Sequence, residues 1–378
     1  MLLKGTAADS ELRTAFQLYL LGVLRMFPYW KPHSYFKQNN FIEVIVTRIL
    51  DCLNPETEDF FFFVFKTYVD FSLDDTSDLE YFGNVASYFF RGLMQDCPIL
   101  SLKSISRLIN ECLRLIESEV YDLRSFLPEA PVGAPLNELL RKYFILPASS
   151  LAATFHALRT QRKTDSSLKL DCEHLSTILL TYLSSISSFL SNCVSFEAEL
   201  ASLLKLILKM LKLIVLLYHI SVESTFSIVH LVVQSRINFK NASNYREILS
   251  DSCQLLLECA KLKCELIQSA LVCFRDAVIS LDFVDLSLDS SATGGDINYY
   301  DTAASIGPYI GALFRLQIDI NKDRSVCDGI LNSLLSVVPD ESNQSEASQN
   351  FNSDSARYLS CPHAISTLGH VAGVSGDE

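Results

Sequence analysis

The chain has 378 residues, of which 49% are hydrophobic and 20% are charged, and its mean hydropathy is +0.23. This composition excludes a largely disordered chain and supplies enough apolar side chains for a sizeable core. The chain holds only 13 glycines and 11 prolines, which argues against turn-rich all-β folds and glycine-rich nucleotide-binding folds. The length fits about two or three domains, or one elongated helical array.

The net charge of the chain is acidic. Lysine and arginine number 31 against 44 aspartates and glutamates, which gives a formal charge of −13. Proteins that bind nucleic acid usually carry a basic surplus, because counterion release from phosphate drives their affinity. We therefore do not expect nucleic acid as the main ligand, although a local basic stripe is compatible with this composition.

The cysteines and the N-terminal sequence bear on the compartment. The chain has 11 cysteines, an odd number, and most of them lie in apolar, helix-like stretches without a CxxC motif. This pattern predicts reduced thiols in the core of a cytoplasmic or nuclear protein. The first residues lack the apolar region of a signal peptide. Cys253 and Cys264 fall on one face of a single expected helix, where packing is the favoured interpretation.

A membrane span is the interpretation to weigh for residues 174–196, a run of 23 residues without charge. Apolar side chains recur there every three or four residues, and the serines fall mostly on the other face. This pattern predicts an amphipathic helix rather than a span. The next apolar segment, 200–220, contains three lysines, whose insertion into a bilayer is costly.

Helical periodicity dominates the first half of the chain. Thr57 is expected to cap the third helix, and the aromatic run 60–65 in that helix predicts burial on several sides. The predicted helices cover residues 10–27, 41–53, 57 onward, 77–94, 101–118, 136–144 and 147–162.

The second half is expected to contain longer helices. The fourth of them is so long that we expect a kink or break within it. Residues 284–300 are polar and rich in turn-forming residues, and residues 339–378 predict a disordered tail. The predicted helices cover residues 171–193, 196–220, 222–237, 244–282, 302–318 and 325–338.

About a dozen successive helices with no convincing strand predict an all-α fold. Helix pairs recurring at roughly 40 residues match the scale of HEAT and armadillo units, which indicates an α-solenoid. No recurring residue signature supports the repeat, so an irregular multi-helix bundle remains the alternative. We predict four parts, which are an N-terminal helical array at 1–127, a boundary region with two short helices and a polar linker at 128–170, a long-helix array at 171–338 and the tail at 339–378.

Motifs that carry chemistry are missing from the sequence. It contains no phosphate-binding glycine loop, no HExxH and no GxSxG, and no cysteine has an outstanding cationic setting. We therefore expect no catalytic residues, no metal site, no cofactor and no small-molecule substrate.

One basic stripe is the most suggestive surface feature. Lys205, Lys209 and Lys212 recur at steps of four and three and share one face of a predicted helix. The opposite face holds Leu203, Ile207, Met210, Ile214 and Leu217. Such a face suits an anionic ligand or an acidic partner, and the simpler interpretation is the solvated side of a core helix.

These patterns together predict a non-enzymatic helical scaffold or adaptor. We expect it to bind other proteins within a larger intracellular complex through the shape and apolar faces of its helices. Two alternatives remain open. One is a helical subunit of a nuclear complex for DNA replication or repair that uses the lysine face, and the other is a membrane-associated helical protein.

Overall fold

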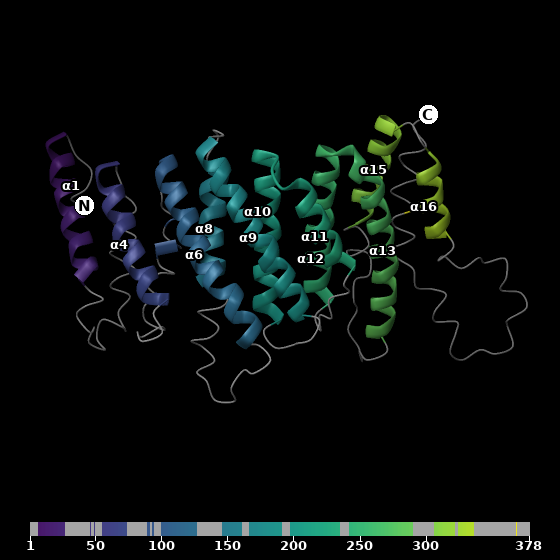
Figure 1. Cartoon of the computed structure of the whole chain (residues 1–378), viewed down its shortest axis with the longest axis horizontal. Helices are drawn as coiled ribbons and strands as arrows, with labels where there is room; N and C mark the ends of the chain where they lie inside the picture. Colours follow the sequence, from purple (N-terminus) through teal and green to yellow (C-terminus); the bar gives the residue numbers. More distant parts are fainter. Residues whose placement is uncertain are drawn as a thin grey trace, which may run out of the picture. The chain divides into compact units, whose positions relative to one another are not determined.

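A computed structural model describes residues 7–26, 46, 49, 55–73, 89–90, 93, 100–126, 146–160, 166–190, 197–234, 242–289, 306–321, 324–335 and 368. These residues are almost entirely helical and include no strand, which confirms the predicted all-α class (Figure 1). The α-helices are α1 (Ala7–Met26), α4 (Pro55–Leu73), α6 (Leu102–Phe126), α8 (Leu146–Thr160), α9 (Ser166–Leu190), α10 (Glu197–Tyr218), α11 (Val222–Gln234), α12 (Ala242–Leu262), α13 (Ile267–Asp289), α15 (Gly307–Leu316) and α16 (Ser325–Leu335).

The chain forms two compact units. The first comprises Met1–Phe189 and Ala198–Ile220, and the second comprises Leu190–Glu197 and Ser221–Glu378. Helices α1 to α10 therefore belong to the first unit and α11 to α16 to the second. The division into four parts, with a boundary region at 128–170, stays a prediction.

Three helices of the first unit run parallel with a period of 44 residues. Tyr68 on α4 donates its hydroxyl proton to the carbonyl of Leu24 on α1, 44 residues earlier. Lys103 on α6 reaches back over the same 44 residues to Asp59 on α4. Nearer the other end of α4, Arg114 of α6 binds Asp70, again 44 residues earlier. Because the offset is equal near both ends of α4, α4 and α6 point in the same direction, and α4 lies between α1 and α6 (Figure 1).

The same period governs which side chains are buried. Three consecutive core positions of α1 recur in α4 and α6 at this offset, and every one of them is buried. The three sets are Gln17, Phe61 and Ile105, then Leu21, Phe65 and Ile109, then Leu24, Tyr68 and Cys112. Two shorter described pieces follow suit, since the helical, buried residues Val46 and Ile49 correspond to Phe90 and Leu93. The period matches the predicted scale of HEAT and armadillo units.

Helix α4 is the aromatic centre of this row. The Phe65 ring lies 5.5 Å from that of Phe89 and 4.9 Å from that of Phe90, and neither ring is exposed to solvent. Phe63 is the exception, because 47% of it is exposed, and the Arg25 guanidinium of α1 lies 4.7 Å above its ring. The run 60–65 is therefore largely buried between neighbours, as its sequence predicts.

In the second unit, the consecutive helices α11 and α12 are antiparallel. Lys263, just after α12, pairs with Glu223 in the first turn of α11, so the end of one helix meets the start of the other. The long helix predicted at 244–282 is broken, as expected. Lys263 has extended backbone angles, a short 3-10 turn spans Cys264–Leu266, and α13 begins at Ile267.

Several predicted boundaries and faces are wrong. Helix α4 begins at Pro55, where a missing N–H costs nothing, so Thr57 lies inside the first turn rather than capping it. Its buried hydroxyl instead donates to Gln17 Oε1 at 3.1 Å. The α13 helix continues to Asp289, so residues 284–289 are helical rather than turn-rich. The expected tail after residue 338 lies outside the described residues except at position 368.

The structure describes the burial of three serines in the run 174–196, and of these only Ser184 is exposed. Ser176 and Ser185 are buried although the serines were expected mostly on the outer face. Their hydroxyls donate to backbone carbonyls of the preceding turn, which satisfies them without solvent. No helix in the described residues has the length and apolar character that crossing a membrane requires.

Candidate functional site

The predicted lysine stripe lies along α10. Lys209 is exposed, and Lys205 and Lys212 are partly exposed, on the side of the helix that also exposes Ser202 and Leu216. The opposite positions Leu203, Ile207, Met210 and Ile214 are buried as predicted, whereas Leu217 is only partly buried. The stripe is thus the solvated side of a helix whose other sides are packed, and its role in binding an anion or a partner stays a prediction.

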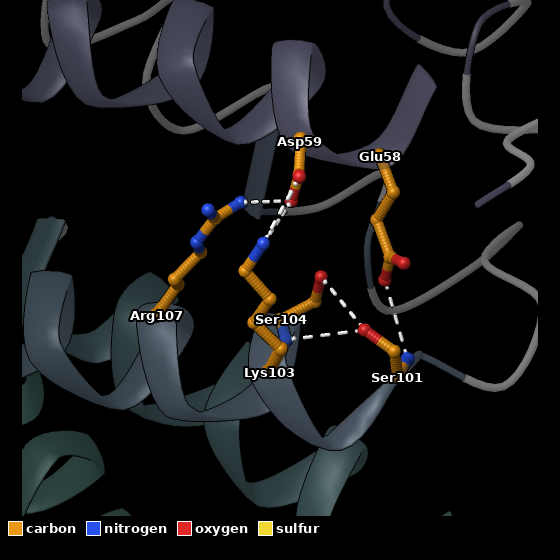
Figure 2. A network of polar contacts seen from close by, with 6 residues as sticks. All are labelled: Glu58, Asp59, Ser101, Lys103, Ser104 and Arg107. Atoms are coloured by element: carbon orange, nitrogen blue, oxygen red, sulfur yellow. Dashed lines mark hydrogen bonds and ion pairs between the residues drawn. The ribbon is translucent and has the colours of Figure 1, made fainter. Parts of the chain in front are cut away.

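A second charged surface, which the sequence did not indicate, lies between α4 and α6 (Figure 2). Lys103 Nζ donates to both carboxylate oxygens of Asp59 at 3.0 Å, and Arg107 Nη1 donates to Oδ1 of the same residue at 2.7 Å. The hydrogen bond from Lys103 and the two positive charges hold the pKa of Asp59 below its usual value. Asp59 therefore remains ionised and ties two turns of α6 to one side chain of α4.

The start of α6 is anchored in the same surface. Ser101 precedes the helix, and its hydroxyl accepts the N–H of Ser104 at 3.3 Å, which caps the first turn. The Ser101 N–H in turn donates to Glu58 Oε1 at 3.2 Å. One carboxylate of α4 thus fixes the capping residue of α6, and the neighbouring carboxylate fixes the first basic turn (Figure 2).

A matching cluster lies further along the two helices. Arg114 binds Asp70 of α4 and also donates to Glu111 Oε2 at 2.6 Å on its own helix. Burial raises the pKa of Glu111, and the charge of Arg114 opposes that shift. We name the set Asp59, Asp70, Lys103, Arg107, Glu111 and Arg114 the α4–α6 charge ladder.

The α4–α6 charge ladder has a structural rather than a chemical character. Each of its cations contacts a carboxylate, and the contacts are shared between two helices. On the other side of α6, the Ser106 hydroxyl donates to Asp171 of α9 at 2.5 Å, and His174 lies 3.6 Å from Glu117. Polar contacts therefore extend from α4 across α6 to α9 and align three helices.

The cysteines in the described residues are free thiols, and all except Cys264 are buried. Burial raises the pKa of Cys112 to about 11 and those of Cys172, Cys259 and Cys273 to about 12. These thiols stay protonated at neutral pH, which is the opposite of what a cysteine nucleophile needs. The expectation that Cys253 and Cys264 share a helix face is wrong, because the helix breaks between them.

Metal sites and short glycine or cysteine motifs are the remaining kinds of site to consider. Within the described part of the chain, no group of three His, Cys, Asp or Glu side chains is placed to hold a metal ion. Two further motifs of the sequence, Gly294-Gly295, whose following acidic residue disfavours a phosphate, and Cys361-Pro362-His363, which offers two kinds of metal ligand, lie outside the described residues.

One sequence signal would have led to the charge ladder. Asp59 and Lys103, like Asp70 and Arg114, are opposite charges at the 44-residue separation that also relates the core positions. A search for charge pairs at the expected repeat length would have found both. The chain matches no family model, no curated protein and no solved structure.

Proposed function

We propose that this protein is a non-enzymatic helical scaffold that binds other proteins within a larger intracellular complex. The observation that carries the proposal is the row of parallel helices α1, α4 and α6, repeated every 44 residues. Stacked helices of this kind build extended surfaces whose shape comes from the repeat and whose outer side chains are free to vary. Binding on such a surface uses complementarity of shape and apolar contacts, and no bond is made or broken.

The test is affinity purification of the tagged full chain with quantitative mass spectrometry. Two matched variants of α4 accompany the wild type, namely Phe65→Ala, which removes a fully buried ring, and Phe63→Ala, which removes a half-exposed one. We expect partner proteins to co-purify with the wild type in near-stoichiometric amounts. Phe65→Ala is expected to lose them, whereas Phe63→Ala is expected to retain those that bind away from Phe63. The proposal fails if the wild type retains no protein beyond the tag-only control.

A second candidate function is a subunit of a nuclear DNA replication or repair complex that touches nucleic acid. The alignment of Lys205, Lys209 and Lys212 on the solvated side of α10 supports it. Three phosphate contacts predict a slope of about −3 when the logarithm of affinity is plotted against that of salt concentration.

The test of this second candidate compares two triple variants in a DNA-binding titration. Lys205, Lys209 and Lys212 are changed to Glu in one, and the scattered exposed lysines Lys66, Lys169 and Lys261 in the other. Salt-dependent binding that only the first variant abolishes supports the candidate. Equal effects of the two variants, or no binding by the wild type, rule it out.

A further inference from the structure

Helix α1 has two apolar faces, and only one of them is packed. Gln17, Leu21 and Leu24 are at most 2% exposed and lie on the side that meets α4. Of the eleven large hydrophobic side chains exposed in the described residues, five belong to this one helix, namely Leu12, Phe16, Leu18, Tyr19 and Met26. A helix that is apolar all round is normally covered on both sides.

The exposed side chains follow the spacing of a two-helix seam. Leu12, Phe16, Tyr19 and Met26, together with the partly buried Val23, recur at alternating steps of four and three, which places them on one stripe about 21 Å long. Leu12 and Tyr19 are each 68% exposed, Phe16 is 51% exposed and Met26 is 45% exposed. This stripe, which we name the α1 seam, lies opposite the face that packs on α4.

Two corresponding positions, one just before α6 and one in its first turn, are buried. At the 44-residue period, Leu12 corresponds to Leu100 and Phe16 to Ser104. Leu100 is 7% exposed and Ser104 is 1% exposed. These two positions are therefore buried at the start of α6 and open on α1, whereas Tyr19, Val23 and Met26 correspond to Arg107, Glu111 and Arg114 of the charge ladder.

We propose that the α1 seam binds the α1 seam of a second copy of this chain, with the two helices antiparallel around a two-fold axis. This arrangement places Phe16 next to Tyr19 of the second copy at the centre, and Leu12 next to Val23 towards each end. A two-fold axis makes each contact twice, so a single self-complementary stripe supplies both halves of the interface.

Charge and shape along one edge of the α1 seam favour the antiparallel copy. Glu11 and Arg25 are exposed on the same side of the seam, near opposite ends of the helix, and the Arg25 guanidinium also lies over the Phe63 ring of α4. In the antiparallel pair, Glu11 of each copy comes level with Arg25 of the other, and the helix dipoles also oppose. The small residues Ala15 and Gly22 lie between this edge and the seam, and a Cβ added to Gly22 would meet no atom of the same chain within 4 Å. The two helices therefore have room to approach closely along this edge.

The inference does not depend on the proposed function, because a chain can pair through α1 whether or not it binds other proteins. The test is the mass of the full chain by sedimentation equilibrium over a range of concentrations. The wild type is expected to be dimeric, and Tyr19→Glu is expected to weaken the dimer at least thirtyfold, as the loss of a central aromatic contact does. A wild type that stays monomeric at its highest soluble concentration overturns the inference.

One control and two further variants of the α1 seam keep the result independent of folding. Leu231→Glu on α11 changes a leucine that is 62% exposed, much like Leu12, and is expected to leave the dimer intact whereas Leu12→Glu separates it. Gly22→Gln adds a good helix former that fits the single chain, yet it is expected to weaken the dimer by blocking close approach. A dimer that survives both Leu12→Glu and Gly22→Gln overturns the inference.

The antiparallel direction is tested by exchanging charges. Glu11→Arg and Arg25→Glu are each expected to weaken the dimer about three- to tenfold, and the double variant is expected to restore it. Failure of the double variant to bind more tightly than either single variant contradicts the antiparallel arrangement.

Discussion

Neighbouring helices are aligned differently in the first and second units. In the first unit, α4 and α6 lie side by side although they are 44 residues apart, and the α4–α6 charge ladder joins them near both ends of α4. In the second unit, α11 and α12 are separated only by residues 235–241, and α12 and α13 only by the turn at 263–266. A short connection fixes the relative height of consecutive helices by itself. Parallel helices lack that constraint, so side-chain pairs have to supply it.

The buried side chains of the two units differ as well. Between α1, α4 and the helical residues 89–90, the buried side chains are mainly aromatic. The hydroxyl of Tyr68 donates a hydrogen bond to the backbone carbonyl of Leu24. In the second unit, the core of α12 and α13 includes the thiols of Cys253, Cys259 and Cys273. An aromatic side chain buries a large area, whereas a cysteine is a small apolar residue. A single substitution is therefore expected to do more damage in the first unit.

The largest expected effect is that of Phe65→Ala. The ring is fully buried among other aromatic rings, so its removal leaves a cavity and is expected to lower the free energy of unfolding by about 3–5 kcal/mol. Phe63→Ala, two residues earlier and 47% exposed, is the matched control and is expected to cost far less. Urea unfolding of both variants measures the difference. Similar losses of unfolding free energy would show that the aromatic core does not stabilise the packing of α1, α4 and α6.

The next largest expected effect is a pH dependence of stability in the second unit. The pKa values of Cys259 and Cys273 are raised to about 12 by burial, above the ordinary value of 9.0. Their contribution to stability is therefore complete below about pH 9 and is lost as the pH rises towards 12, by about 1.4 kcal/mol per pH unit and thiol. The double variant Cys259→Ala and Cys273→Ala is expected to lose less stability than the wild type between about pH 8 and pH 10.

Urea unfolding at the two pH values provides the measurement. The control is Cys264→Ala, since Cys264 is exposed at the turn between the helices. Identical pH dependence in the double variant and the wild type would mean that these thiols do not ionise on unfolding in the way their burial implies.

A smaller effect is expected from a test of the pairing between Arg114 and Glu111 in the charge ladder. Arg114→Met leaves the largely buried carboxylate of Glu111 without its cation and is expected to cost about 1–2 kcal/mol. Adding Glu111→Gln is expected to recover part of this loss, because the raised pKa of Glu111 shows that its ionised form is disfavoured by burial. Denaturant midpoints of the single and double variants test the coupling. Purely additive losses would mean that the two residues act separately.

The smallest effect concerns the end of α10. His219 follows the helix with φ 53°, a left-handed conformation that glycine adopts without strain, and its N–H donates to the carbonyl of Val215. His219→Gly is expected to raise stability by about 0.5–1 kcal/mol. Ser227→Gly within α11, at an exposed helical position, is expected to lower stability by a similar amount. A gain from both changes would contradict the strain at His219.

The fold was predictable to the extent that local spacing controls it. The helices around residues 146–160, 197–218 and 325–335 begin and end within a few residues of their predicted limits, because their apolar spacing is regular. The break after Leu262 was expected from length alone. The prediction that Thr57 caps the third helix is wrong because that helix already begins at Pro55. A threonine near the start of a helix has the sequence pattern of a cap even when it lies inside the first turn.

The candidate site was less predictable. The lysine stripe followed from spacing within one helix, so α10 shows it as expected apart from Leu217. The charge ladder joins residues on two helices, and no spacing within either helix reveals it. The repeat was hidden for a related reason, since equivalent core positions hold residues as different as Gln17, Phe61 and Ile105. Burial is conserved from one helix to the next while residue type is not.

The sequence by itself determined that this protein is helical, and roughly where each described helix runs, because backbone hydrogen bonds and three-to-four-residue apolar spacing are local properties. Tertiary structure decided which faces meet, which charges pair, and that α1 keeps a second apolar face exposed. Those outcomes depend on contacts between residues about 44 positions apart. Such contacts are set by packing among several helices at once, and no single stretch of sequence encodes them.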